Sequence, residues 1–134
     1  MLVRLLVAGL LLTHAAIHVG FVSRRPPAKL GAPPWPFDLG RSWLHARLGV
    51  PAGAVRALGS ALVAVTIGGY ALAALTTLGI LPAGAWGATA AVGSIASLAL
   101  LLVGFHPWLA AGVAIDLVLL WVVLVAAWTP DLLA

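Results

Sequence analysis

The sequence predicts an all-α integral membrane protein, an antiparallel bundle of four transmembrane helices that forms a single membrane domain over residues 1–134. Of its residues, 63% are hydrophobic and only 7% are charged, and the mean hydropathy is +1.18. A soluble domain carries about 25% charged residues, so this chain lacks the polar groups that a water-facing surface needs. Because one span takes about 20 apolar residues, the chain has room for four or five spans.

The first predicted span covers about residues 2–22. It ends in the run from Ser23 to Pro27, where charge and proline both oppose a continuing membrane helix. The segment resembles a secretory signal peptide, with Arg4 before an apolar run. No small-residue cleavage site follows that run, so we expect the span to be retained.

A loop over about residues 23–50 follows, rich in proline. Three aromatic residues are interleaved with the prolines: Trp35, Phe37 and Trp43. A disordered linker has few aromatic residues, so we expect this loop to be ordered against the bundle or the membrane surface. Asp38 is placed to cap an interfacial helix over about residues 39–48.

The other predicted spans cover about residues 52–80, 83–105 and 108–128. The connections between them are very short, which indicates antiparallel helical hairpins. Small residues recur in the second and third spans: Gly59, Gly68, Gly69, Gly84, Gly87, Ala90, Gly93, Ser97 and Gly104. Small residues let membrane helices approach closely, either within one bundle or between copies of it.

The net charge of +4 does not indicate a nucleic-acid partner, because five of the seven basic residues lie in the first loop: Arg24, Arg25, Lys29, Arg41 and Arg47. Such a cluster is typical of a cytoplasmic loop, which places both termini outside. The Arg-, Ala- and Leu-rich composition favours a bacterial inner (plasma) membrane. The chain has no cysteine, so disulfides and thiolate metal sites are excluded.

The most informative polar residues are His14 and His18 in the first span and Asp116 in the fourth. Ionisable groups inside a bilayer are costly and mark functional sites. The two histidines are four residues apart and share a helix face. At about 1.5 Å of rise per residue, His14 and Asp116 both lie roughly 12 Å inside the same membrane boundary, so they can meet.

Two imidazoles and a carboxylate are the minimal set for an iron, copper or zinc site, with His106 or His45 as a further ligand. The alternative cofactor is haem b, held by His14 or His18 together with His106. A quinone is a third ligand class, with Tyr70 and Thr66 lining the pocket. Arg56 is a candidate to pair with Asp116 and hold it in place.

Structural explanations compete with each of these roles. The histidine pair could bond to neighbouring helices, Asp116 could form an ion pair with Arg56, and His106 and His45 could be rim and loop residues. Ala15 follows His14, so the general base of helical zinc proteases is missing. Serines have no evident base partner, which disfavours metal-free hydrolase chemistry: Ser42, Ser60, Ser94 and Ser97.

These features predict a metal- or haem-binding membrane protein with a redox or metal-dependent role, and they leave open whether it is an enzyme. One alternative is a non-catalytic accessory or assembly subunit of a larger membrane complex. Another is a small proton-coupled transporter or a quinone- or lipid-binding protein. The expected partners are the lipid bilayer and either other proteins or further copies of this chain.

Overall fold

The computed structural model describes residues 1–24, 27, 30–31 and 34–133, and within these ranges it contains helices and no strand. Four helical segments of the described chain are long and apolar enough to cross a membrane: Leu2–Phe21, Ala52–Thr77, Ala83–Val103 and Pro107–Leu124. The all-helical fold class is therefore confirmed.

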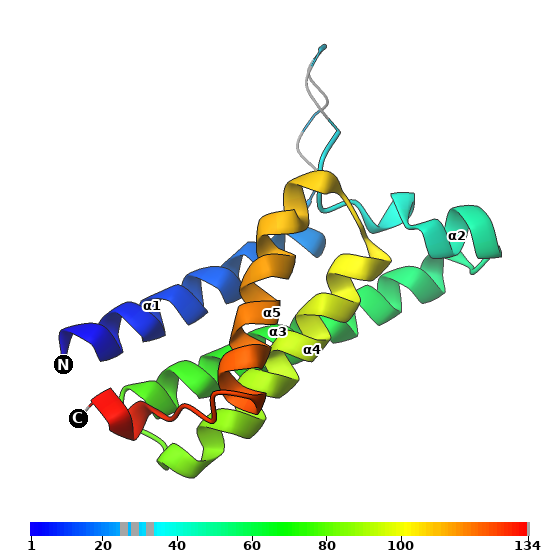
Figure 1. Cartoon of the computed structure of the whole chain (residues 1–134). Helices are drawn as coiled ribbons and strands as arrows, with labels where there is room; N and C mark the ends of the chain where they lie inside the picture. Colours follow the sequence, from blue (N-terminus) through cyan, green and yellow to red (C-terminus); the bar gives the residue numbers. More distant parts are fainter. Residues whose placement is uncertain (25–26, 28–29, 32–33, 134) are drawn as a thin grey trace.

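The long helices run in alternating directions, and the two termini lie at the same end of the molecule (Figure 1). Helix α1 (Leu2–Ile17) packs against α3 (Ala52–Thr77), α3 packs along α4 (Trp86–Val103), and α4 packs against α5 (Ala110–Leu124). Helix α4 thus lies between α3 and α5.

Each predicted span differs from the observed helix at its ends. The α-helical part of the first span stops at Ile17 and continues as a 3-10 helix over His18–Phe21. The helix of the second predicted span, α3, ends at Thr77 rather than at residue 80, because Gly79 has a φ of +76°. The helix of the fourth predicted span, α5, ends at Leu124 rather than at residue 128. This end lies three residues before Ala127, which has a φ of +47°.

The helix expected over residues 39–48 is divided at Ser42 into a 3-10 turn (Leu39–Arg41) and α2 (Trp43–Leu48). As expected, the carboxylate of Asp38 caps the turn, accepting a hydrogen bond from the Gly40 amide at 2.9 Å. The side chain of Leu39 then fills the space that a Cβ at Gly59 would occupy, which fixes the turn against α3.

Two side chains tie α2 to the carboxyl end of α4. Ser42 Oγ donates to the Val103 carbonyl at 2.6 Å, and Trp43 Nε1 donates to the Leu102 carbonyl at 2.7 Å. The last carbonyls of a helix have no partner within it, so these bonds satisfy groups that would otherwise lack one. The described part of the loop near α2 is therefore docked on the bundle.

Replacing Ser42 with alanine is expected to lower the free energy of unfolding by about 1–2 kcal/mol, because the buried Val103 carbonyl loses its donor. The same change should expose amides of α2 to faster hydrogen exchange. Ser23→Ala is the control, because Ser23 is exposed and bonds only to its own helix. Equal exchange in both variants would contradict the docking role.

Candidate functional site

A single carboxylate, that of Asp116 on α5, joins all four long helices. Its Oδ1 accepts hydrogen bonds from the Tyr70 hydroxyl on α3 and from His14 Nε2 on α1, the latter at 2.8 Å. Its Oδ2 accepts from Ser97 Oγ on α4 at 2.5 Å. Tyr70 is also hydrogen-bonded to Ser94 Oγ at 3.1 Å. These five residues and His18 form what we call the Asp116 cluster: His14, His18, Tyr70, Ser94, Ser97 and Asp116.

The cluster is almost completely buried. Asp116, Tyr70, Ser94 and Ser97 have no exposed surface, and His14 retains only 3%. Charge-assisted hydrogen bonds gain strength where water is excluded, and a buried carboxylate without donors would be strongly disfavoured. The three donors to Asp116 explain how the chain holds this carboxylate inside an apolar bundle.

His18 extends the cluster toward the first loop. Its Nδ1 donates to the backbone carbonyl of His14 at 2.9 Å, and its Nε2 lies 2.7 Å from Ser97 Oγ. Ser97 Oγ therefore stands between His18 and Asp116. The 3-10 helix that begins at His18 places this ring beside α4.

The line of hydrogen bonds from His18 through Ser97 to Asp116 holds one proton that can reside on either His18 or Asp116. A carbonyl only accepts, so His18 Nδ1 is protonated, and Ser97 has one hydrogen for two partners. If Ser97 donates to an ionised Asp116, then His18 Nε2 must carry a second proton. If Ser97 donates to His18, then Asp116 must carry it. Both arrangements use the same heavy-atom positions, and the line from His18 to Asp116 has the same total charge in each.

His14 connects the cluster to a cavity of about 160 Å³ between α1 and α5. Its Nε2 faces Asp116, whereas its Nδ1 forms no hydrogen bond with any described residue. The other cavity walls are mainly apolar: Ile17, Phe21, Phe37, Leu101, Trp108, Leu109 and Ile115. Gly112 also lines the cavity, where a Cβ would lie 3.2 Å from Leu101 Cδ1 and 3.8 Å from His14 Cε1.

The structure thus brings together four predicted site residues: His14, His18, Tyr70 and Asp116. It places the remaining candidates elsewhere. His106 is half-buried and caps a 3-10 turn, its Nδ1 accepting from the Trp108 amide at 3.2 Å. His45 is exposed and bonds to the Val50 carbonyl at 2.8 Å.

Two predicted supporting residues also lie outside the cluster's hydrogen bonds. Arg56 is exposed and lines a different cavity, and Asp116 takes its hydrogen bonds from neutral donors and from histidine. The Thr66 hydroxyl is fully buried on α3 and finds no hydrogen-bond partner within the described residues. Within the same residues, no three or more side chains of His, Asp or Glu are arranged to hold a metal ion.

Sequence reasoning missed the serines. Ser97 was expected to lack a base partner, but its Oγ contacts both His18 and Asp116. The sequence signal that points to Ser97 is its position among the small residues of the third predicted span, where helices approach closely. The arrangement is not a catalytic triad, because Asp116 contacts the serine rather than the far nitrogen of His18. Ser97 is also fully buried and does not line the cavity beside His14.

Comparison with protein-family models, curated proteins and solved structures finds no match for the chain. The function is therefore inferred from the geometry of the Asp116 cluster and the cavity beside it.

Proposed function

We propose that the chain is an integral protein of a bacterial inner membrane, an antiparallel four-span bundle with a cytoplasmic first loop and outward termini. The four long apolar helices support the membrane assignment. The concentration of arginine and lysine in the first loop supports the orientation. In this arrangement the histidine cavity lies toward the cytoplasmic side.

We further propose that the cavity binds the hydroxyl end of a lipid-soluble molecule of the quinol class. The observation that carries the proposal is that His14 lines an apolar cavity, while its Nδ1 has no hydrogen-bond partner among the described residues. When Nε2 donates to Asp116, Nδ1 is an acceptor, and a quinol hydroxyl is a matching donor. Apolar pockets with one or two placed polar groups are typical of ligand sites.

The Asp116 cluster would then serve as the proton store for this ligand. A proton accepted at His14 Nδ1 is stabilised by the Asp116 carboxylate on the other side of the ring. The line through Ser97 to His18 lets Asp116 be charged or neutral without movement of heavy atoms. We therefore expect ligand binding to be coupled to proton exchange.

A metal ion or haem b is the second candidate ligand, and one observation favours it. Metal-binding histidines commonly donate their other ring N–H to a carboxylate, as His14 does to Asp116. In that case His14 Nδ1 would be the ligand and Asp116 the orienting group. His18 could join only by giving up Ser97, because its other nitrogen is bonded to the His14 carbonyl.

Equilibrium binding of a short-chain quinol to the purified full chain tests the proposal. His14→Gln is expected to weaken binding about tenfold, the equivalent of one hydrogen bond. Ala111→Phe should also weaken binding, because Ala111 lines the cavity but is not part of the Asp116 cluster. His45→Gln is the control, because His45 is an exposed loop residue.

The same preparation distinguishes the two ligand classes through its metal content and its visible absorption spectrum. Stoichiometric iron, copper or zinc that disappears in His14→Gln would favour the metal or haem candidate over the quinol. Quinol affinity that is equal in the wild type and both cavity variants would refute the quinol proposal.

A further inference from the structure

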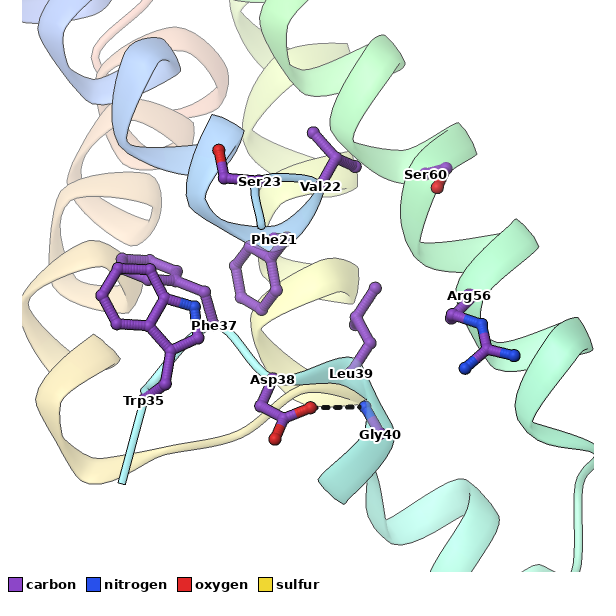
Figure 2. Close-up of a pocket in the computed structure, with 10 residues that line it drawn as sticks. All are labelled: Phe21, Val22, Ser23, Trp35, Phe37, Asp38, Leu39, Gly40, Arg56 and Ser60. Carbon is purple, nitrogen blue, oxygen red and sulfur yellow. Dashed lines mark hydrogen bonds between the residues drawn. The ribbon is translucent and has the colours of Figure 1, made fainter. Parts of the chain in front are cut away.

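An open cavity of about 490 Å³ lies between the loop helix α2 and the carboxyl end of α4, and we call it the arginine cavity. This volume is in the range of ligand sites. The described residues that line it are Arg41, Trp43, Arg47, Leu102 and Phe105. None of them lines the histidine cavity, or the separate cavity at the loop end that contains Arg56 and is shown in Figure 2. A ligand of the arginine cavity would therefore bind apart from the proposed quinol.

The charged side chains of this cavity are both positive. Arg41 and Arg47 are exposed, and their guanidinium groups form neither an ion pair nor a hydrogen bond with any described residue. No acidic residue of the described chain lines the cavity. A guanidinium presents five N–H donors in a plane and can pair with two phosphate oxygens at once. The cavity therefore matches a phosphate group that carries a net negative charge.

Both arginines belong to segments whose backbone is held in place. Arg41 ends the 3-10 turn that is capped by the hydrogen bond from the Gly40 amide to Asp38, which is drawn in Figure 2. Arg47 lies in α2, which Trp43 attaches to the end of α4 through its indole N–H. A site on ordered backbone loses less conformational entropy when a ligand binds, so we expect this one to be partly preorganised.

The other walls of the cavity favour a lipid over a soluble phosphate. Leu102 and Phe105 are each 60% exposed, and Trp43 is 44% exposed. Leu102 lies in the last turn of the third span, and Phe105 follows it directly. Arginines next to exposed apolar side chains at the end of a membrane helix match a molecule with a charged headgroup and an acyl chain.

We propose that the arginine cavity binds an anionic phospholipid of the bilayer. Arg41 and Arg47 hold its phosphate, and an acyl chain packs along Leu102 and Phe105. A zwitterionic lipid has the same phosphate, but its ammonium group would lie near two arginines in a cavity without an acidic wall residue, and like charges repel. The proposal rests on the membrane assignment and is independent of quinol binding.

The full chain in nanodiscs of equal phosphatidylglycerol, phosphatidylethanolamine and phosphatidylcholine tests this site, with the retained lipids measured by native mass spectrometry. We expect a threefold to tenfold enrichment of phosphatidylglycerol, roughly what one or two partly exposed ion pairs supply. The double variant Arg41→Gln/Arg47→Gln should lose this enrichment, and each single variant should lose part of it. Millimolar glycerol 3-phosphate should not displace the retained lipid, because it has no acyl chain.

Arg24→Gln/Arg56→Gln is the matched control, because it removes the same charge from two exposed arginines that do not line the arginine cavity. It should keep the wild-type enrichment. An equal loss in both double variants would overturn the proposal in favour of a diffuse attraction between the basic loop and the membrane. Displacement by glycerol 3-phosphate would overturn it in favour of a soluble phosphate ligand. Equal retention of the three lipids by the wild type would show that no anionic lipid site exists, and it would leave the quinol proposal unaffected.

Discussion

Asp116→Ala is expected to lower the free energy of unfolding by about 3–5 kcal/mol, the range measured when one partner of a buried charged network is removed. The variant leaves the Tyr70 hydroxyl and His14 Nε2 without their acceptor in a region that is almost completely buried. It also removes the partner of Ser97 and with it the shared proton on the line to His18. Because the carboxylate joins four helices, we expect the loss to affect the whole bundle.

Chemical or thermal denaturation in one detergent, followed by circular dichroism, measures this effect. Asp131→Asn is the control, since Asp131 is exposed after the last long helix. Asp116→Asn should fall between the wild type and the alanine variant, because its amide keeps one acceptor oxygen but turns an N–H₂ group toward another donor. An Asp116→Ala protein within about 1 kcal/mol of wild type would show that the network adds little to stability, as single hydrogen bonds in membranes often do.

The sequence predicted those features of the site that depend on how deep each residue lies below the membrane boundary. His14, His18 and Asp116 could be placed together because helical rise fixes how far each lies from the membrane boundary. Depth does not fix rotation about the helix axis or the choice of neighbour. Arg56 was therefore a reasonable partner for Asp116 by height, although it lines the cavity at the loop end.

The serines of α4 could not be recognised, for a related reason. Within a membrane helix, a serine that bonds its own backbone and one that bonds another helix have the same sequence pattern. Only the packing of α4 between α3 and α5 brings Ser97 to both His18 and Asp116. The break in the loop helix is likewise a tertiary effect, because Ser42 bonds to α4 as well as to its own helix.

The glycines of the second and third spans indicated close helix packing, and the structure shows which of them make it. A Cβ at Gly69 would lie 2.7 Å from both Cα and N of Gly93, which are backbone atoms that cannot turn aside. A Cβ at Gly68, one position earlier, would meet nothing within 4 Å. Gly69 therefore makes the close contact between α3 and α4, whereas the adjacent Gly68 takes no part in it.

Gly69→Ala is therefore expected to force α3 and α4 apart and to cost about 3 kcal/mol or more, at the upper end of overpacking effects. Gly68→Ala is the matched control and should be neutral or slightly stabilising, because alanine favours the helix where space is free. Denaturation of the two variants under the same conditions measures the difference. Equal stability would mean that the helices accommodate a methyl group at this contact.

The same substitution also reports on the Asp116 cluster, because the glycine contact sets its geometry. Gly69 and Gly93 each precede a cluster residue, Tyr70 and Ser94, whose side-chain oxygens lie 3.1 Å apart. Separating the two backbones should therefore weaken the bonds that Tyr70 makes to Ser94 and Asp116. Tyr70 is the only tyrosine of the chain, so its ultraviolet resonance Raman bands report this hydrogen bonding directly. We expect the bands to shift in Gly69→Ala and to remain unchanged in Gly68→Ala. A destabilised Gly69→Ala protein with unchanged tyrosine bands would show instead that the cluster holds together independently of the helix contact.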